Sequence, residues 1–88
     1  MTVPILKLNP VFRLQWEPAQ DAHVLLYPEG MVKLNQSAGE ILKRCNGTRD
    51  IDALIADLQQ AFNAQDIENE VRSFVAEAAR RGWLEAAA

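Results

Sequence analysis

At residue 35 the chain changes from the two-residue periodicity of strands to the three-to-four-residue periodicity of helices. Before this point, short segments alternate apolar and polar side chains or are apolar on both faces. After it, apolar side chains recur at helical spacing. Strands gathered in one half and helices in the other indicate an α+β fold. The length of 88 residues allows one domain with a single core.

Three strands are expected in the first half. Residues 11–17 alternate cleanly, with Trp16 among the side chains expected to face inward. Residues 22–27 are apolar on both faces, which favours a central strand, and residues 31–34 form the third. Because the connections are short, we expect an antiparallel meander with residues 22–27 in the middle.

Three helices are expected in the second half. Asn35 is a candidate N-cap for the first, although Ser37 and Glu40 also fit a capping box, which leaves the start open. Residues 46–47, Asn-Gly, are expected to end this helix. The other two helices are expected to begin near Asp50 and Asp66, and Gly82 to end the third. The side chains expected to face the core are Ala38, Ile41, Leu42, Cys45, Ile51, Leu54, Ile55, Leu58, Phe62, Ile67, Val71, Phe74, Val75 and Ala78.

This order, a three-stranded antiparallel sheet followed by three helices, resembles a winged helix-turn-helix. Residues 1–10 contain two prolines and are expected to form an extended N-terminal arm that could cover the edge of the first strand. Residues 11–85 are expected to form the single domain, with Trp83-Leu84 folded back onto the core, and residues 86–88 a tail.

The charge balance argues against nucleic acid as a partner. The formal net charge is −3, whereas binding to phosphates normally requires a basic surplus. Residues 1–44 hold five basic and four acidic side chains (+1), and residues 45–88 hold four basic and eight acidic (−4). The first half therefore tolerates an acidic partner better than the second. A DNA-binding winged helix remains the alternative function.

The chain offers poor material for catalysis or for a cofactor. It has one cysteine, Cys45, and one histidine, His23, so it has neither a zinc quartet nor a Cys-His catalytic pair. Asp50 and Asp57 are two helical turns apart, which is typical of a solvated face. Because the chain lacks these catalytic and metal-binding groups, we expect a protein that is not an enzyme and has no cofactor or metal. No signal peptide or membrane-spanning stretch is recognisable, so we also expect a cytoplasmic protein with no membrane partner.

The remaining candidate function is binding at the edge of the sheet. If the meander is right, residues 31–34 form an edge strand whose unpaired backbone groups could accept an incoming peptide strand. The alternative is a short edge on which Lys33 deters pairing, and the pattern alone favours neither. The same edge could also pair with a second copy, giving a homodimer.

One long motif bears on this choice. It consists of Tyr27-Pro28-Glu29-Gly30-Met31-Val32-Lys33-Leu34-Asn35, then Ser37-Ala38-Gly39-Glu40-Ile41-Leu42 and Cys45-Asn46-Gly47, with outlying segments Phe12-Arg13-Leu14-Gln15-Trp16-Glu17 and Arg81-Gly82-Trp83-Leu84. It resembles the PqqD family of pyrroloquinoline quinone (PQQ) biosynthesis over nearly the whole chain beyond residue 10. The resemblance implies a peptide chaperone, or RiPP recognition element, that binds the precursor peptide PqqA and presents it to the radical SAM enzyme PqqE.

The resemblance also implies a binding site. Related recognition elements hold their peptides along the third strand and against the third helix. The corresponding residues here are Met31, Val32, Lys33 and Leu34 on the strand, and Val71, Arg72, Val75, Ala78 and Ala79 on the helix.

Overall fold

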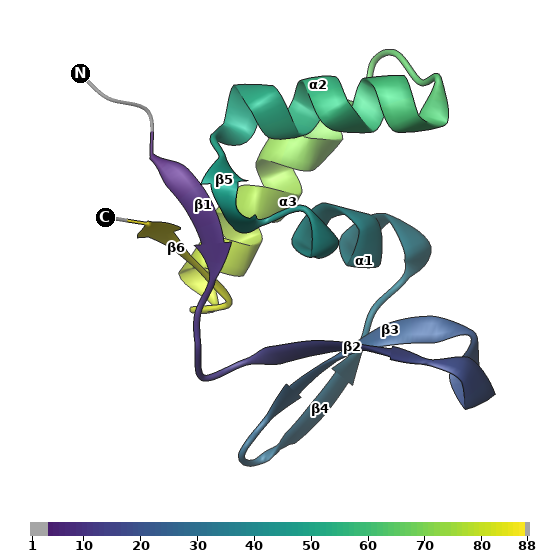
Figure 1. Cartoon of the computed structure of the whole chain (residues 1–88), viewed down its shortest axis with the longest axis vertical. Coiled ribbons are helices and arrows are strands. Elements are labelled where there is room, and N and C mark those ends of the chain that lie inside the picture. Colours follow the sequence, from purple (N-terminus) through teal and green to yellow (C-terminus); the bar gives the residue numbers. More distant parts are fainter. Residues whose placement is uncertain (1–3, 88) are drawn as a thin grey trace.

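A computed structural model describes residues 4–87, which form three α-helices and two three-stranded antiparallel sheets (Figure 1). The strands are β1 (Ile5–Leu8), β2 (Arg13–Glu17), β3 (Ala22–Tyr27), β4 (Gly30–Lys33), β5 (Asn46–Arg49) and β6 (Leu84–Ala87). The helices are α1 (Gln36–Lys43), α2 (Ile51–Phe62) and α3 (Glu68–Arg80), and a short 3-10 turn spans Pro18–Gln20. In the view of Figure 1, the β2–β3–β4 sheet lies below the helices and the β5–β1–β6 sheet lies to their left.

The predicted meander is confirmed. The strand order is β2–β3–β4, with both pairs antiparallel and β3 in the centre. Val24 and Leu25 of β3 are fully buried, as expected for a strand that is apolar on both faces. A two-residue turn joins β3 to β4, so Tyr27 lies opposite Gly30.

The second sheet was not predicted. Residues 5–8, expected to belong to an arm along the first strand, instead form β1, which pairs with β5 and β6 and not with β2. Pro4 and Pro10 bracket this strand without interrupting it. The expected tail also pairs, because Ala86 and Ala87 of β6 lie opposite Leu6 and Ile5. Residues 1–3 and 88, the remainder of the expected arm and tail, lie outside the described residues.

The α+β class is therefore confirmed, but the expected order of sheet followed by helices is wrong. Strand β5 lies between α1 and α2, where residues 46–47 were expected only to end a helix. Helix α1 instead ends at Lys43, with Arg44 as its C-cap. Gly47 has φ of +87°, a conformation that a glycine adopts without strain, and the ladder between β1 and β5 is irregular there.

The helix N-termini follow the expected caps in two cases. The Asn35 side chain accepts a hydrogen bond of 2.8 Å from the Ala38 N–H, which decides between the two starts considered for α1. Asp50 caps α2 in the same way, through the Ala53 N–H. Helix α3 begins at Glu68, two residues beyond Asp66, and has no side-chain cap.

The core lies where α1, α2 and α3 meet β3. Ten of the fourteen predicted inward side chains are buried, and Ile51, Ile67 and Phe74 are partly exposed and pack against the core. The remaining side chain, Phe62, is 46% exposed. Trp16, also predicted to face inward, is 48% exposed and packs edge-on against His23 at 5.0 Å between ring centroids. Phe62 is the last residue of α2, and Trp16 is the last residue but one of β2.

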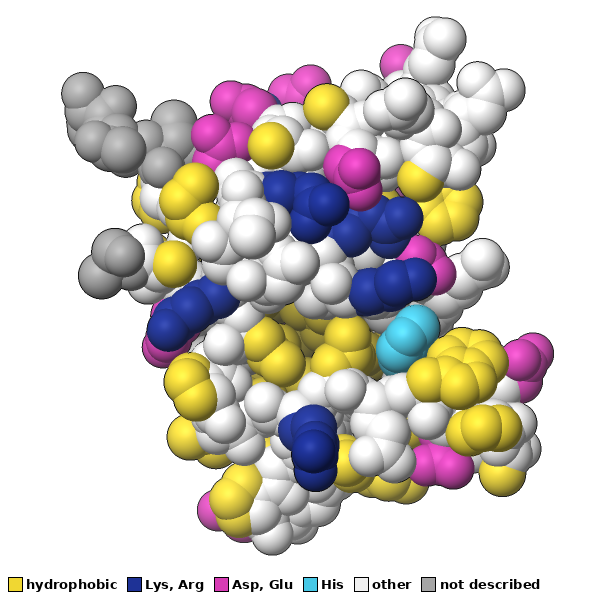
Figure 2. Space-filling view, viewed as in Figure 1, with side chains coloured by type: hydrophobic (Ala, Val, Ile, Leu, Met, Phe, Trp, Pro, Cys, Tyr) yellow, Lys and Arg dark blue, Asp and Glu magenta, His cyan; other side chains and the backbone are white. Residues whose placement is uncertain are grey.

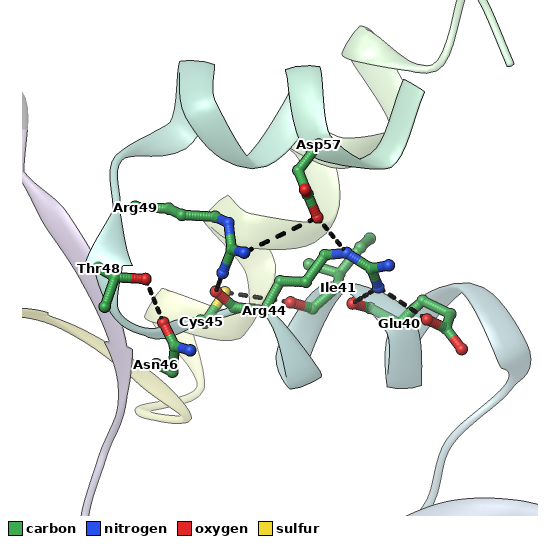
Figure 3. Close-up of polar contacts among 8 residues, drawn as sticks. All are labelled: Glu40, Ile41, Arg44, Cys45, Asn46, Thr48, Arg49 and Asp57. Atoms are coloured by element: carbon green, nitrogen blue, oxygen red, sulfur yellow. Dashed lines mark hydrogen bonds and ion pairs between the residues drawn. The ribbon is translucent and has the colours of Figure 1, made fainter. Parts of the chain in front are cut away.

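Arg44 ties the first two helices together (Figure 3). Its Nε donates to Asp57 Oδ2 of α2 at 2.6 Å, and its Nη1 donates to Glu40 Oε1 of α1 at 2.7 Å. Arg49 of β5 donates to the Arg44 carbonyl oxygen at 3.1 Å. Asp57 therefore does not pair functionally with Asp50, which caps α2, but serves to hold α1, β5 and α2 in one arrangement.

Candidate functional site

Strand β4 is an edge of its sheet. Its one strand partner among residues 4–87 is β3, so the other side of its backbone is open to an incoming strand. Met31 is 52% exposed and Lys33 is exposed, whereas Val32 packs against the core. The structure therefore confirms the edge that the strand pattern predicted.

The ladder between β3 and β4 determines which backbone groups face outward. The Leu34 N–H donates to the His23 carbonyl oxygen at 3.0 Å, so Leu34 belongs to a hydrogen-bonded pair. Hydrogen-bonded and non-hydrogen-bonded pairs alternate along an antiparallel ladder. The backbone N–H and C=O groups of Val32 therefore also point toward β3. Met31 and Lys33 then direct their N–H and C=O groups away from β3, where a peptide strand could bond to them.

An apolar groove has Asn35, two residues after the end of β4, among its lining residues. It has a volume of about 370 Å³ and lies between the N-terminal turn of α1, the end of α2 and the first half of α3. Its lining residues include Asn35, Ala38 and Ile41 from the first of these elements, Leu58 and Phe62 from the second, and Ile67, Glu70, Val71 and Phe74 from the third. We call this recess the α1–α3 groove.

Two carboxylates line the α1–α3 groove, of which Glu40 is paired with Arg44 and Glu70 forms no ion pair with another residue in the range 4–87. Glu40 and Glu70 line it, and no lysine or arginine does. The hydrogen bond from Arg44 holds the pKa of the Glu40 carboxyl below its ordinary value, so this group is ionised at neutral pH. The Arg44 guanidinium also lies 5.5 Å from the ring centroid of Phe62, which fixes an aromatic wall of the groove.

The structure places the nine residues implied by the resemblance in three different environments. Met31, Val32 and Lys33 lie on β4, with Leu34 buried directly after it. Of the helix residues, Val71, Val75 and Ala78 are buried in the core, and Val71 also lines the α1–α3 groove.

The other two helix residues lie apart from that groove. Arg72 donates to Asp52 of α2 at 2.7 Å and to Glu68 at 2.9 Å, so its side chain is directed toward α2. Ala79 is exposed near the end of α3.

The sequence did not single out Ile67, Glu70 and Phe74 as site residues. Ile67 and Phe74 had been assigned only to the core, and Phe74 also packs on Trp83, with 6.5 Å between ring centroids. The signal that could have found Glu70 is its position one turn before Phe74 and one residue before Val71, on the side of α3 that faces the groove.

Cys45 is buried in the core and has a structural role. Burial raises the pKa of the Cys45 thiol to about 11, which leaves little reactive thiolate. Residues 4–87 contain no group of three His, Cys, Asp or Glu side chains arranged to hold a metal ion. Within the same described range, no helix is long and apolar enough to cross a membrane.

Comparison with known proteins identifies the family. The profile described as "Coenzyme PQQ synthesis protein D (PqqD)" matches residues 22–84. The chain belongs to the PqqD family. The resemblance of its Tyr27 to Leu42 motif is thereby confirmed, and the alternative of a DNA-binding winged helix has no support from these matches.

Relatives in the PqqD family match over most of their length. A protein of Pseudomonas paraeruginosa named "PqqA binding protein" is 51% identical over 85 residues, which cover 96% of this chain and 90% of the relative. A protein of the same name from Azotobacter vinelandii is 52% identical over 82 residues, covering 92% of this chain and 89% of the relative.

Solved structures support the fold. The PqqD part of Methylobacterium extorquens PqqCD, described as a functional and stand-alone RiPP recognition element, matches with a TM-score of 0.75. It is 28% identical, and the match covers 91% of this chain and 87% of that one. The heterocyclase TruD also contains this fold, with a TM-score of 0.74 at 23% identity, covering 97% of this chain and 12% of TruD.

Proposed function

We propose that this chain binds the precursor peptide PqqA as an added strand on β4, with peptide side chains in the α1–α3 groove, and presents it to PqqE. The observation that carries this proposal is the open edge of β4, where Met31 and Lys33 direct their backbone groups outward. The name shared by relatives about half identical to this chain supports PqqA as the peptide.

The magnitudes indicate why strand pairing on β4 is not sufficient by itself. Met31 and Lys33 can form four backbone hydrogen bonds with a peptide, each contributing about 0.5–1.5 kcal/mol. Ordering a flexible peptide costs about 2–5 kcal/mol, which is of the same size as the whole ladder. Strand pairing therefore mainly offsets the loss of peptide entropy, and net affinity must come from side chains.

The α1–α3 groove supplies the apolar part of that affinity. Burying one large apolar side chain contributes about 1.5–3 kcal/mol, and Ile41, Ile67 and Phe74 offer a surface for it. The carboxylate of Glu70 favours a peptide whose apolar anchor stands near a basic side chain. We therefore assign the groove wall to Ile67, Glu70, Val71 and Phe74, in place of Arg72 and Ala79.

The chain's proposed role in the pathway is positional. The burial of Cys45 and the name "PqqA binding protein" of the relatives support a carrier role, so we assign the chemistry to PqqE. Holding PqqA on a carrier that also binds PqqE raises the effective concentration of the peptide at that enzyme.

A pair of substitutions at Lys33 tests the strand model. Lys33→Pro removes one outward N–H, and an edge strand tolerates this change because the lost donor does not bond to β3. Lys33→Ala removes the same side chain but keeps the N–H. We expect Lys33→Pro to weaken PqqA binding about 2- to 13-fold relative to Lys33→Ala, from one hydrogen bond of about 0.5–1.5 kcal/mol.

Isothermal titration calorimetry would measure the two affinities, and amide NMR spectra would confirm that both variants are folded. Equal affinities in two folded variants contradict the strand model. Chemical-shift changes on adding PqqA should concentrate at residues 30–35 and around the α1–α3 groove. Changes confined to other surfaces would also rule out this site.

A homodimer through the same edge remains a separate proposal. If β4 pairs with a second copy, PqqA and self-association compete for Met31 and Lys33. Sedimentation velocity over a range of protein concentrations, with and without PqqA, tests this. A dimer that persists with saturating PqqA excludes pairing through β4.

A further inference from the structure

A second recess lies between the end of α1, β1 and β2. It has a volume of about 570 Å³, and its apolar lining includes Leu8, Phe12 and Leu14. Figure 2 shows hydrophobic side chains in a hollow between the helices and the lower sheet, with lysine and arginine side chains on the surface around it. We call this recess the basic hollow.

The basic hollow has the opposite charge to the α1–α3 groove. Lys7, Arg13 and Lys43 line it, and none of its lining residues is acidic. Arg13 and Lys43 form no ion pair with another residue in the range 4–87, whereas Lys7 lies 3.4 Å from the exposed Glu85. Two cations beside an apolar surface thus lack a carboxylate partner within the described chain.

We propose that the basic hollow docks an acidic segment of the enzyme that receives the bound peptide, with an apolar side chain of that segment inserted against Phe12 and Leu14. The argument is charge complementarity, since cations around an apolar recess fit carboxylates flanking an apolar anchor. The separate location of the recess allows peptide and enzyme to bind together. The identity of this partner rests on the proposed function, while the charge and shape of the hollow do not.

A second copy of this chain is a poorer occupant. Much of the acidic surface of α2 and α3 is already paired within the chain: Asp52 with Arg72, Asp57 with Arg44, and Glu77 with Arg81. Moreover, contact between a basic hollow and a different acidic surface would be heterologous and would lead to rings or open chains of molecules.

Zero-length carbodiimide cross-linking can identify the segment directly. With purified PqqE and PqqA present, the reagent joins a lysine Nζ to a partner carboxylate as an amide, with loss of water. We expect Lys7 or Lys43 to be joined to Asp or Glu residues of one PqqE segment. Cross-links to PqqE that involve neither lysine would overturn the proposal.

Substitutions supply the quantitative test. Arg13→Gln with Lys43→Gln should weaken PqqE binding by about tenfold and reduce its dependence on salt, because two charges are removed from the contact. The matched control is Arg80→Gln with Arg81→Gln, which removes two charges at the far end of α3. Equal weakening by both pairs, or by neither, contradicts the proposal.

PqqA affinity without PqqE separates this proposal from the proposed function. The Arg13→Gln, Lys43→Gln variant should bind PqqA like the unsubstituted chain. If it loses PqqA affinity, the basic hollow belongs to the peptide and the docking proposal is wrong. If the unsubstituted chain fails to bind PqqA but retains salt-dependent PqqE binding through the hollow, only the proposed function fails.

Discussion

The backbone of Gly39 lies against the His23 imidazole so closely that a Cβ at residue 39 would come within 2.8 Å of His23 Nδ1 and 3.2 Å of His23 Cβ. The first atom could move by rotation of the ring, but the second is fixed by the backbone of β3. Helix α1 thus packs on β3 at a distance that only glycine allows. This contact sets the position of the α1 N-terminus, where the α1–α3 groove begins.

We predict that Gly39→Ala destabilises the chain, although alanine favours helices by about 1 kcal/mol over glycine. The clash should lower the free energy of unfolding by about 1–3 kcal/mol, as overpacking does in other cores. Urea unfolding followed by circular dichroism measures this change. In a His23→Ala background the same substitution should cost less, and a Gly39→Ala chain of unchanged or higher stability contradicts the contact.

Asn35 and Asp50 allow a matched test of capping. Each accepts one backbone hydrogen bond at 2.8 Å, so replacing either with alanine should cost about 0.5–2 kcal/mol of stability. Asn35 lines the α1–α3 groove and Asp50 does not. Only Asn35→Ala should therefore also weaken PqqA binding. Equal effects of both substitutions on calorimetric affinity would show that the α1 N-terminus is not part of the site.

The features that the sequence predicted are local ones. Strands β2, β3 and β4 follow from alternation and short turns, and the caps of α1 and α2 follow from one side chain each. Strand β5 has the sequence Asn-Gly-Thr-Arg, which has no apolar alternation, and it forms because β1 pairs with it from the other end of the chain. Such long-range pairing leaves no periodic signal.

The site was predictable to the same extent. The edge strand followed from the order of three adjacent strands, but the α1–α3 groove requires three elements to be placed in space. Ile67 and Phe74 carry the same apolar signal as core residues, so periodicity could not show that they remain partly exposed. Arg72 was assigned to the groove wall by the family resemblance, and its ion pair with Asp52 of α2 leaves no signal in the sequence.

The lowered pKa of Glu40 predicts how the stability of the chain changes in acid. Because the Arg44 hydrogen bond lowers its folded pKa below the unfolded value, Glu40 contributes stability that is present above the unfolded pKa. That contribution is lost as the pH falls through the folded pKa. We expect Glu40→Gln to lower the free energy of unfolding at neutral pH and to make it fall less between neutral pH and pH 3. Parallel pH profiles for the two chains would contradict this assignment.

Cys45 reports on opening of the core. Its side chain is buried and its pKa is raised to about 11, so iodoacetamide at pH 8 should modify it only when the chain opens. The labelling rate should therefore rise with urea in step with unfolding, and binding of PqqA should slow it. Mass spectrometry measures the rate. Rapid labelling of the folded chain, with no effect of urea below the transition, would show that Cys45 is accessible.

Glu70 tests the electrostatics of the α1–α3 groove. It is exposed, lines the groove and forms no ion pair with another residue between positions 4 and 87, so its carboxylate is available to a basic side chain of PqqA. Glu70→Lys should weaken PqqA binding several-fold, with a larger effect at low salt, because reversal of a charge at the rim turns attraction into repulsion. The control is Asn69→Lys, which adds a positive charge to the neighbouring exposed position outside the groove lining. If both substitutions change the affinity equally, the net charge of the chain and not the groove governs the effect, and Glu70 does not contact the peptide.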